Sequence, residues 1–320
     1  MKQRITALDM ERIIIYDLPF DAPTLHEIED IVRQAAPIVS PSSRFDQYSF
    51  LEYAKERDIH NSQFHALFDL NVTLNVQRLA RLKNADQSMK ETAALLSLLI
   101  ITDTLFEISF GMIEYAQINS ESSACEVINL FHVADNVAPN LYADIALNRK
   151  SRLLESDLPE IEDSHASFSP VLHYNWHMHY MGLLGLVVLS KGPGRPVDKV
   201  CKYLEWMWSD FAFSAPCILF SLIYLSSKTF KGMFKDIGSG KPDLVLNGIR
   251  NAAWDLATAH YWSSRVTEAV GSGSIWIFCT FDKALREIAT NLLTDCDEQY
   301  DLEHISSFVS SYWSSERAPR

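Results

Sequence analysis

Two acids that each end a short apolar run are the residues of this chain best suited to chemistry. Asp69 ends the run HALFD, which begins at His65, and Asp282 ends the run IWIFCTFD, which begins at Ile275. Ligands of open parallel sheets bind beyond the carboxyl ends of the strands, so both acids are expected at such an edge. Carboxylates gathered there repel one another unless a hard cation such as Mg²⁺ or Mn²⁺ lies between them. The pattern therefore predicts a divalent-metal site.

Two further acids lie in segments with a helical pattern. Glu114 lies in GMIEYA and Asp255 in RNAAWDL, and Glu107 is a rival for the place of Glu114. Asn71 follows the first strand-ending acid by two residues, and Thr280 precedes the second by two. Their polar side chains are of the kind that orient a ligating carboxylate or a water.

The order of these residues resembles the PIN domain, a family of metal-dependent nucleases. In that family a strand-ending Asp-x-Asn, a Glu on an internal helix, an Asp on a later helix and a Thr-x-Asp before the last helix bind one or two divalent ions. The matching residues here are Asp69 with Asn71, Glu114, Asp255, and Thr280 with Asp282.

The resemblance implies a nuclease, with RNA as the expected substrate and Mg²⁺ or Mn²⁺ as the cofactor. Asp69 and Asp255 are then the principal metal ligands, and Asp282 binds the same ion or a second one. Glu114 is a ligand or orients the attacking water. Hydrolysis of a phosphodiester bond needs an activated water and stabilised phosphoryl charge, and a bound metal supplies both.

The expected fold is α/β, with a PIN-like parallel sheet flanked by helices and a helical insertion or subdomain. The resemblance covers about half of the chain, and residues 118–243 have no counterpart in a minimal PIN fold. Residues 1–60 are expected to form an N-terminal extension, and 61–157 the first part of the core. Residues 158–243 are the predicted helical insertion, and 244–320 the second part of the core with a C-terminal tail.

The charge of the chain limits how it can bind RNA. It has 28 basic and 41 acidic residues, so its net charge is −13 and a nucleic acid needs a local basic patch. The candidate clusters are Arg78, Arg81 and Lys83; Arg149, Lys150 and Arg152; and Lys228, Lys231, Lys235 and Lys241. Such clusters are more often solvated surface than binding sites.

Cysteine usage and the amino terminus favour a cytoplasmic protein. The five cysteines are scattered and odd in number, which argues for free thiols and against a disulfide framework. The first twelve residues lack the apolar core of a signal peptide. The most apolar stretches, 95–113 and 211–225, are interrupted by charges or a proline and fall short of the roughly 20 residues that a bilayer requires, so no membrane span is expected.

Each candidate acid also has a purely structural interpretation. Asp69 and Asp282 are well placed to cap the helices that follow them, because Asp is favoured at that position. Glu114 is equally interpretable as a solvent-facing helix residue. Asp255 could form an ion pair with Arg250 or Arg265.

Two functional alternatives belong to other classes. The first, in place of a nuclease that a partner or inhibitor restrains, is a catalytically silent PIN-like or helical scaffold that binds a protein partner through aromatic residues of the middle region. These residues are Tyr203, Trp206, Trp208, Phe211 and Phe213. The second is a zinc site at His173 and His177, which share one helix face if that segment is helical, with His179 pointing elsewhere.

Overall fold

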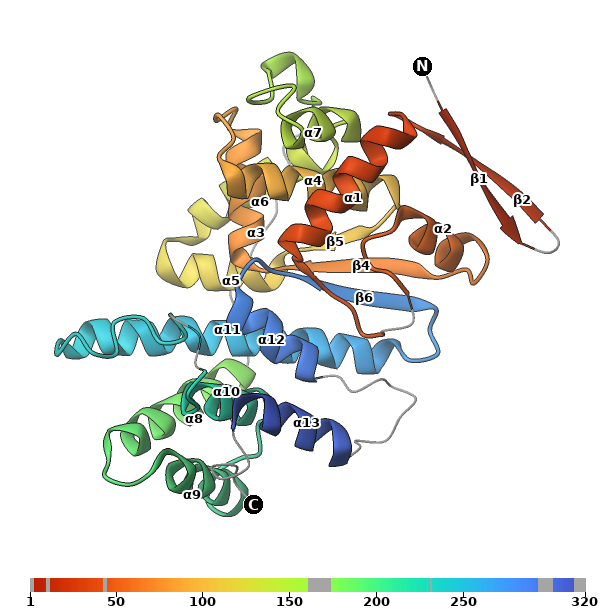
Figure 1. Cartoon of the computed structure of the whole chain (residues 1–320). Helices are drawn as coiled ribbons and strands as arrows, with labels where there is room; N and C mark the ends of the chain where they lie inside the picture. Colours follow the sequence, from red (N-terminus) through yellow and green to blue (C-terminus); the bar gives the residue numbers. More distant parts are fainter. Residues whose placement is uncertain are drawn as a thin grey trace. The chain divides into compact units, whose positions relative to one another are not determined.

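The computed structural model describes residues 3–9, 12–42, 45–160, 174–228, 230, 232–292 and 302–313. Over these residues the chain is a mostly helical α/β protein with thirteen α-helices and a four-stranded mixed sheet (Figure 1). It divides into two compact units. The first comprises Met1–Val171 and Ala269–Phe281, and the second comprises Leu172–Glu268 and Asp282–Arg320.

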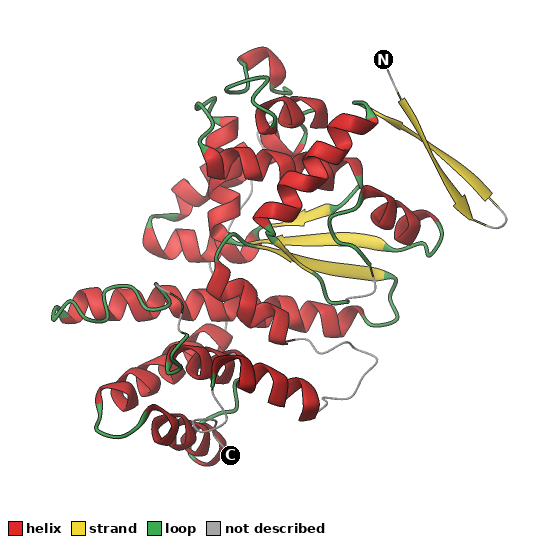
Figure 2. Ribbon diagram, viewed as in Figure 1, coloured by secondary structure: helices red, strands yellow, loops and turns green. Residues whose placement is uncertain are grey.

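The sheet, whose strands are yellow in Figure 2, belongs to the first unit, and these strands come from distant parts of the sequence. In spatial order it consists of β3 (Ile38–Val39), β6 (Ser274–Cys279), β4 (Gln63–Phe68) and β5 (Leu105–Glu107). The central strand β4 runs parallel to both β5 and β6, whereas β3 pairs antiparallel with β6. The two strands predicted from their apolar runs are thus neighbours in a mostly parallel sheet.

The register of β4 and β6 brings their carboxyl ends level. Phe68 lies opposite Cys279 at the last pair of the ladder. One residue further on, the backbone N–H of Asp69 donates to the carbonyl of Cys279 over 3.0 Å. The residues that follow the two strands therefore start from the same point of the sheet edge.

The predicted N-terminal extension takes part in this unit rather than standing apart from it. Residues 1–60 supply β3 and also a separate antiparallel hairpin of β1 (Gln3–Asp9) and β2 (Arg12–Leu18). The hairpin is tied to helix α2 (Phe50–Asp58) because the Tyr16 hydroxyl donates to Asp58 Oδ2 over 2.6 Å. Ile38 and Val39 in β3 are buried, as expected for β-branched residues in a sheet.

Seven α-helices complete the first unit within the described residues. They are α1 (Ala22–Ala35), α2, α3 (Leu70–Ala80), α4 (Gln87–Ile101), α5 (Ser109–Ile118), α6 (Glu121–Asp135) and α7 (Pro139–Ala146). Local capping starts two of them: Asp21 accepts from the Thr24 N–H before α1, and Asp86 accepts from the Met89 N–H before α4. A capping bond of this type stabilises a helix by about 1 kcal/mol.

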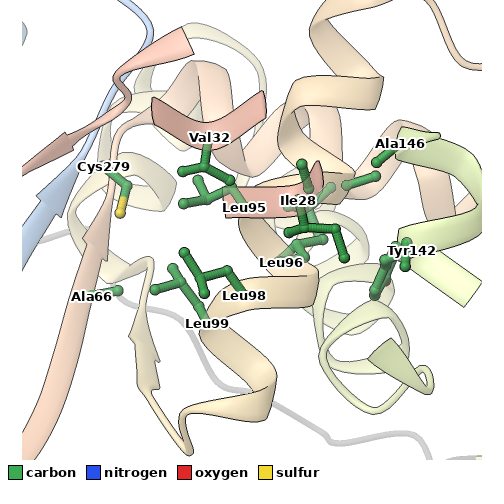
Figure 3. Packing of buried hydrophobic residues seen from close by; sticks show 14 of the residues in the cluster. Ile28, Val32, Ala66, Leu95, Leu96, Leu98, Leu99, Tyr142, Ala146 and Cys279 are labelled. Atoms are coloured by element: carbon green, nitrogen blue, oxygen red, sulfur yellow. The ribbon is translucent and has the colours of Figure 1, made fainter. Parts of the chain in front are cut away.

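The core of this unit lies on one face of the sheet. Phe64, Ala66 and Phe68 of β4 belong to this core, and helices α1, α4 and α7, which pack against one another, contribute to the same cluster. The core residues labelled in Figure 3 are Ile28, Val32, Ala66, Leu95, Leu96, Leu98, Leu99, Tyr142, Ala146 and Cys279. Helix α4 is buried on most of its sides, which explains why its sequence shows a nearly continuous apolar run instead of a helical period.

The second unit is helical. Its elements are α8 (Tyr174–Lys191), α9 (Pro196–Ser209), α10 (Ala215–Tyr224), α11 (Pro242–Ala269, which belongs to this unit up to Glu268), α12 (Lys283–Leu292) and α13 (Leu302–Tyr312). Helix α10 packs against α8, α9, α12 and α13. Of the predicted second core part, 244–320, β6 joins the sheet, whereas α11 and α12 lie in this helical unit.

Glycines on α8 allow its neighbours to approach closely. A Cβ at Gly185 would lie 2.7 Å from the ring of Trp206 on α9, and one at Gly182 would lie 3.0 Å from Cys217 Sγ on α10. Both distances are at or below the closest approach of real Cβ atoms.

The length and apolarity that a bilayer-crossing helix requires are not met by any helix of the described chain.

Candidate functional site

Asp69 lies at the edge where β4 ends, and 3% of it is exposed. It occupies the N-cap position of α3, but its side chain makes no capping hydrogen bond. Instead, Oδ2 accepts a hydrogen bond of 2.9 Å from Oγ1 of Thr280, which follows β6. The helix-capping interpretation of this acid is therefore wrong, because its carboxylate is held across the sheet edge.

Thr280 and Asn71 both donate to the Asp69 carboxylate. Thr280 is fully buried, and its backbone N–H donates to the carbonyl of Pro37 over 2.8 Å, so the backbone fixes its hydroxyl in place. The Asn71 amide lies 3.4 Å from the same Oδ2. These are the two side chains that the sequence predicts to orient a carboxylate, and a role beside a metal stays a prediction.

Glu114 lies on α5 in the same unit and is 8% exposed, so it is not a solvent-facing helix residue. Helix α5 approaches the start of α3 at Gly111, where an added Cβ would lie 3.4 Å from the Leu70 Cα. Glu114 follows Gly111 by three residues and thus lies on the same helix face, about 4.5 Å further along the axis. The contact brings the helix that carries Glu114 to the residue next to Asp69.

Glu107, the rival of Glu114, has a structural contact of its own. It ends β5 and is half-buried. Its Oε1 accepts a 2.7 Å hydrogen bond from the Ser109 N–H at the first residue of α5. The carboxylate thus stabilises the start of that helix, where backbone N–H groups lack partners within the helix.

Asp282 and Asp255 belong to the second unit. Asp282 is exposed, and its Oδ1 accepts from the N–H groups of Ala284 (2.8 Å) and Leu285 (2.9 Å) at the start of α12, so this acid is a helix cap. Asp255 is half-buried on α11. Its predicted ion-pair partners have other contacts: Arg250 donates to Asn247, and Arg265 pairs with Glu268 over 2.7 Å.

Among the residues that the structure describes, no three or more His, Cys, Asp or Glu side chains form a group that could hold a metal ion. Of the four predicted acids, Asp69 and Glu114 belong to the first unit, and Asp255 and Asp282 belong to the second. The participation of Asp255 and Asp282 stays a prediction from the order of the motif.

Most residues of the first two predicted basic clusters are paired with acids. Arg78 pairs with Asp86 over 2.6 Å, and Arg81 pairs with Glu126. In the second cluster, Arg149 lies 3.6 Å from Glu27, and Lys150 lies 3.2 Å from Asp157. In the third cluster, Lys228 donates to the Ser311 carbonyl, and Lys231 lies outside the described residues. These contacts reduce the positive charge that the first two clusters offer to RNA.

The histidine region differs from the zinc interpretation. His173 lies outside the described residues, and His177 is exposed on α8. His179, which the helix pattern sets apart from the other two, is fully buried and bonded to Ser214 and His260. The sequence offers no local signal for this cluster, because its members lie 35 and 81 residues apart along the chain.

The described cysteines are free thiols, as their scattering predicts. They are Cys125, Cys201, Cys217 and Cys279, and Cys296 lies outside the described residues. Burial raises the pKa of the Cys217 thiol to about 12. A thiol of this kind is uncharged at neutral pH and is a poor nucleophile.

Comparison with known proteins yields no relative: no protein-family model, no curated protein and no solved structure matches the chain. The class that the observations define is thus the α/β protein with a mostly parallel sheet and a buried carboxylate at the strand ends.

Proposed function

We propose that this protein is a PIN-like nuclease that hydrolyses phosphodiester bonds of RNA with Mg²⁺ or Mn²⁺, and that Asp69 is its principal metal ligand. The observation that carries the proposal is the 2.9 Å hydrogen bond from Thr280 to Asp69 Oδ2. It joins residues 211 positions apart at the level ends of two parallel strands. Open parallel sheets bind their ligands at this edge.

The donor set suits a magnesium-type ion. Mg²⁺ keeps several of its waters and is commonly held by one or two carboxylates together with phosphates of the substrate. Asp69 and Glu114 in the first unit provide two carboxylates, so a larger protein cage is not required. Asp255 and Asp282 are proposed as additional ligands on the order of the motif.

The residues around Asp69 restrict its orientation. A carboxylate has about four lone-pair positions, and the Thr280 hydroxyl and Asn71 amide occupy positions on Oδ2 only. The metal is proposed to bind the Asp69 carboxylate at this edge of the sheet. A metal bound there supplies an activated water and stabilises phosphoryl charge. Glu114 is proposed to bind the same ion or to hold the attacking water.

Cleavage of labelled single-stranded RNA with Mn²⁺ or Mg²⁺ tests the proposal, with EDTA and Asp69→Asn as inactive references. Glu114→Gln and Glu107→Gln form a matched pair, since they remove the same charge seven residues apart in one unit. We expect loss of cleavage in the first and retention in the second. Calorimetric titration with Mn²⁺ provides a second readout, and absence of both cleavage and binding would reject the nuclease.

The scaffold alternative retains one supporting observation. Trp208 is 78% exposed and Phe213 is 61% exposed, and their rings meet edge to face at 6.1 Å. Tyr203, by contrast, is fully buried, so its predicted place on a partner surface is wrong. Trp206 is half-buried and stacks on Phe211. A protein that neither cuts RNA nor binds Mn²⁺ would favour this alternative.

A further inference from the structure

Three helices of the second unit meet at a buried chain of hydrogen bonds. Ser214, which precedes α10, lies with Oγ 3.0 Å from Nδ1 of His179 on α8. The other ring nitrogen of His179, Nε2, lies 3.2 Å from Nδ1 of His260 on α11. Ser214 is 2% exposed and His179 is fully buried, whereas His260 is half-buried.

The direction of these hydrogen bonds follows from the donors and acceptors that Ser214, His179 and His260 provide. Ser214 Oγ already accepts from the backbone N–H of Cys217 over 3.4 Å, so its hydroxyl proton is available to His179 Nδ1. His179 then carries its proton on Nε2 and donates it to His260 Nδ1. In the opposite direction the Ser214 hydroxyl proton would have no acceptor among the residues that the structure describes. Both imidazoles are therefore neutral in the intact arrangement.

Among the described residues, no carboxylate pairs with either ring to compensate an added proton. Besides Ser214, the titratable groups at the cluster are the thiol of Cys217, 3.5 Å from His179 Nδ1, and the hydroxyl of Tyr203 on α9. Tyr203 donates to the Gly182 carbonyl, and burial raises its pKa far above the usual range. Within the described part of the chain, neither imidazole forms an ion pair with a carboxylate. Protonation thus places an uncompensated charge in the helical packing.

Electrostatics agree with this geometry. Burial, together with a smaller contribution from the nearby His260, lowers the pKa of His179 to about 3. Burial also lowers the pKa of His260. A histidine in an unfolded chain titrates near pH 6.5. Below that pH the unfolded chain takes up protons that the folded unit resists.

We propose that His179 and His260 form an acid-sensitive latch, in which proton uptake by the pair breaks the contact between α8 and α11 and loosens the second unit. At neutral pH the latch is closed by the Nε2–H to Nδ1 hydrogen bond. When both rings are protonated, the N–H groups at His179 Nε2 and His260 Nδ1 face each other across 3.2 Å, and this hydrogen bond is lost. The latch does not depend on the nuclease proposal.

The molecule contains its own reporter for this transition. Of its seven tryptophans, only Trp276 belongs to the first unit. The second unit contains Trp176, Trp206, Trp208, Trp254, Trp262 and Trp313. Trp254, Trp262 and Trp313 are each at most 5% exposed, so loosening of the unit shifts their emission toward that of hydrated indole.

The experiment is a reversible titration of the full chain from about pH 7.5 to pH 4, followed by tryptophan fluorescence and near-UV circular dichroism. We expect a sigmoidal transition that reverses on return to neutral pH. In His260→Gln the side-chain oxygen still accepts from His179 but does not titrate, and the midpoint moves to lower pH by about half a unit or more. His177→Gln, on the exposed side of the same helix, leaves the midpoint unchanged.

Imidazole NMR of the wild-type chain tests the latch without any substitution. We expect the signals of His179 and His260 to titrate at lower pH than an unperturbed imidazole, whose pKa is about 6.5. The proposal is overturned if all histidines titrate near pH 6.5, or if His260→Gln folds and keeps the wild-type midpoint. If His260→Gln does not fold at neutral pH, the NMR titration alone decides.

Discussion

The two units contain buried polar clusters of opposite character. In the first, two donors, Thr280 and Asn71, converge on one oxygen of the Asp69 carboxylate, an arrangement that suits a charged acceptor. In the second, the hydrogen bond between His179 and His260 needs an unprotonated ring nitrogen as its acceptor, so it is lost when both rings are protonated. Burial alone therefore does not tell what a polar side chain does. Its hydrogen-bond partners decide whether the charged or the neutral form is favoured.

The clusters also differ in what positions them. Asp69 and Thr280 follow strands whose ladder sets their spacing through backbone hydrogen bonds. The histidines are positioned by side-chain packing between helices, which depends on close contacts such as that of Gly185 with Trp206. We expect substitutions in the first cluster to change mainly the activity, and substitutions in the second to change mainly the stability.

The largest effect is expected from Asp69→Asn. The substitution keeps the shape of the side chain but removes the charge that is proposed to bind the metal. Loss of a residue that only orients a ligand reduces activity or metal affinity by roughly 10- to 100-fold, so loss of the ligand should reduce cleavage by about 100-fold or more. Steady-state cleavage of labelled RNA measures this. Cleavage within threefold of wild type would remove Asp69 from the site.

Thr280→Val tests the bond that joins the two strand ends. The valine fills the same space but cannot donate to the carboxylate, so cleavage should fall by about 10- to 100-fold. Because a buried acceptor loses its partner, the free energy of unfolding should also fall by about 1–3 kcal/mol. Thr280→Ser keeps the hydroxyl and serves as the control. Equal activity of the two variants would show that the hydrogen bond has no role in catalysis.

Gly248→Ala probes the packing of the second unit. An added Cβ would lie 2.0 Å from the carbonyl oxygen of Lys235, which is a backbone atom that can move only with its segment. Overpacking of this kind costs about 1–3 kcal/mol. Gly238→Ala is the matched control, because no atom lies within 4 Å of its added Cβ. Urea unfolding monitored by tryptophan fluorescence measures both, and equal midpoints would contradict the close contact.

The stability of the second unit should fall as the pH falls from about 6.5 toward 3. Burial lowers the pKa of His179 in the folded chain, so the unfolded chain binds more protons over this range. For one proton the slope approaches about 1.4 kcal/mol per pH unit. His179→Gln should show a shallower decline between about pH 6.5 and pH 5. Carboxylates also contribute to acid unfolding, but equally in both proteins, and parallel curves would exclude His179 as a source.

The smallest effect is expected at Asp282. Asn caps helices about as well as Asp, so Asp282→Asn should change the free energy of unfolding by less than about 0.5 kcal/mol, whereas Asp282→Ala should cost about 1 kcal/mol. Thermal unfolding compares the two. Because Asp282→Asn leaves the fold intact, its RNA cleavage then isolates the proposed metal-binding role of this acid. Unchanged cleavage would leave Asp282 as a helix cap alone.

Local pattern was enough to predict the strands on which the proposed site depends. The apolar runs before Asp69 and from Ile275 to Thr280 are the buried strands β4 and β6, and the α/β class is confirmed. Such runs are informative because a strand buried on both faces needs apolar residues at successive positions. The two side chains predicted to orient a carboxylate or a water, Asn71 and Thr280, were also recognisable, since each lies two residues from a predicted acid.

The tertiary structure alone decided which of these side chains meet. It showed that Thr280 reaches Asp69, that the Asp282 carboxylate caps α12, and that Tyr203 is buried. It also revealed His179 and His260 as partners, 81 residues apart. Composition and periodicity indicate which residues of one segment are buried. Strand register and helix packing determine which residues from distant segments come into contact.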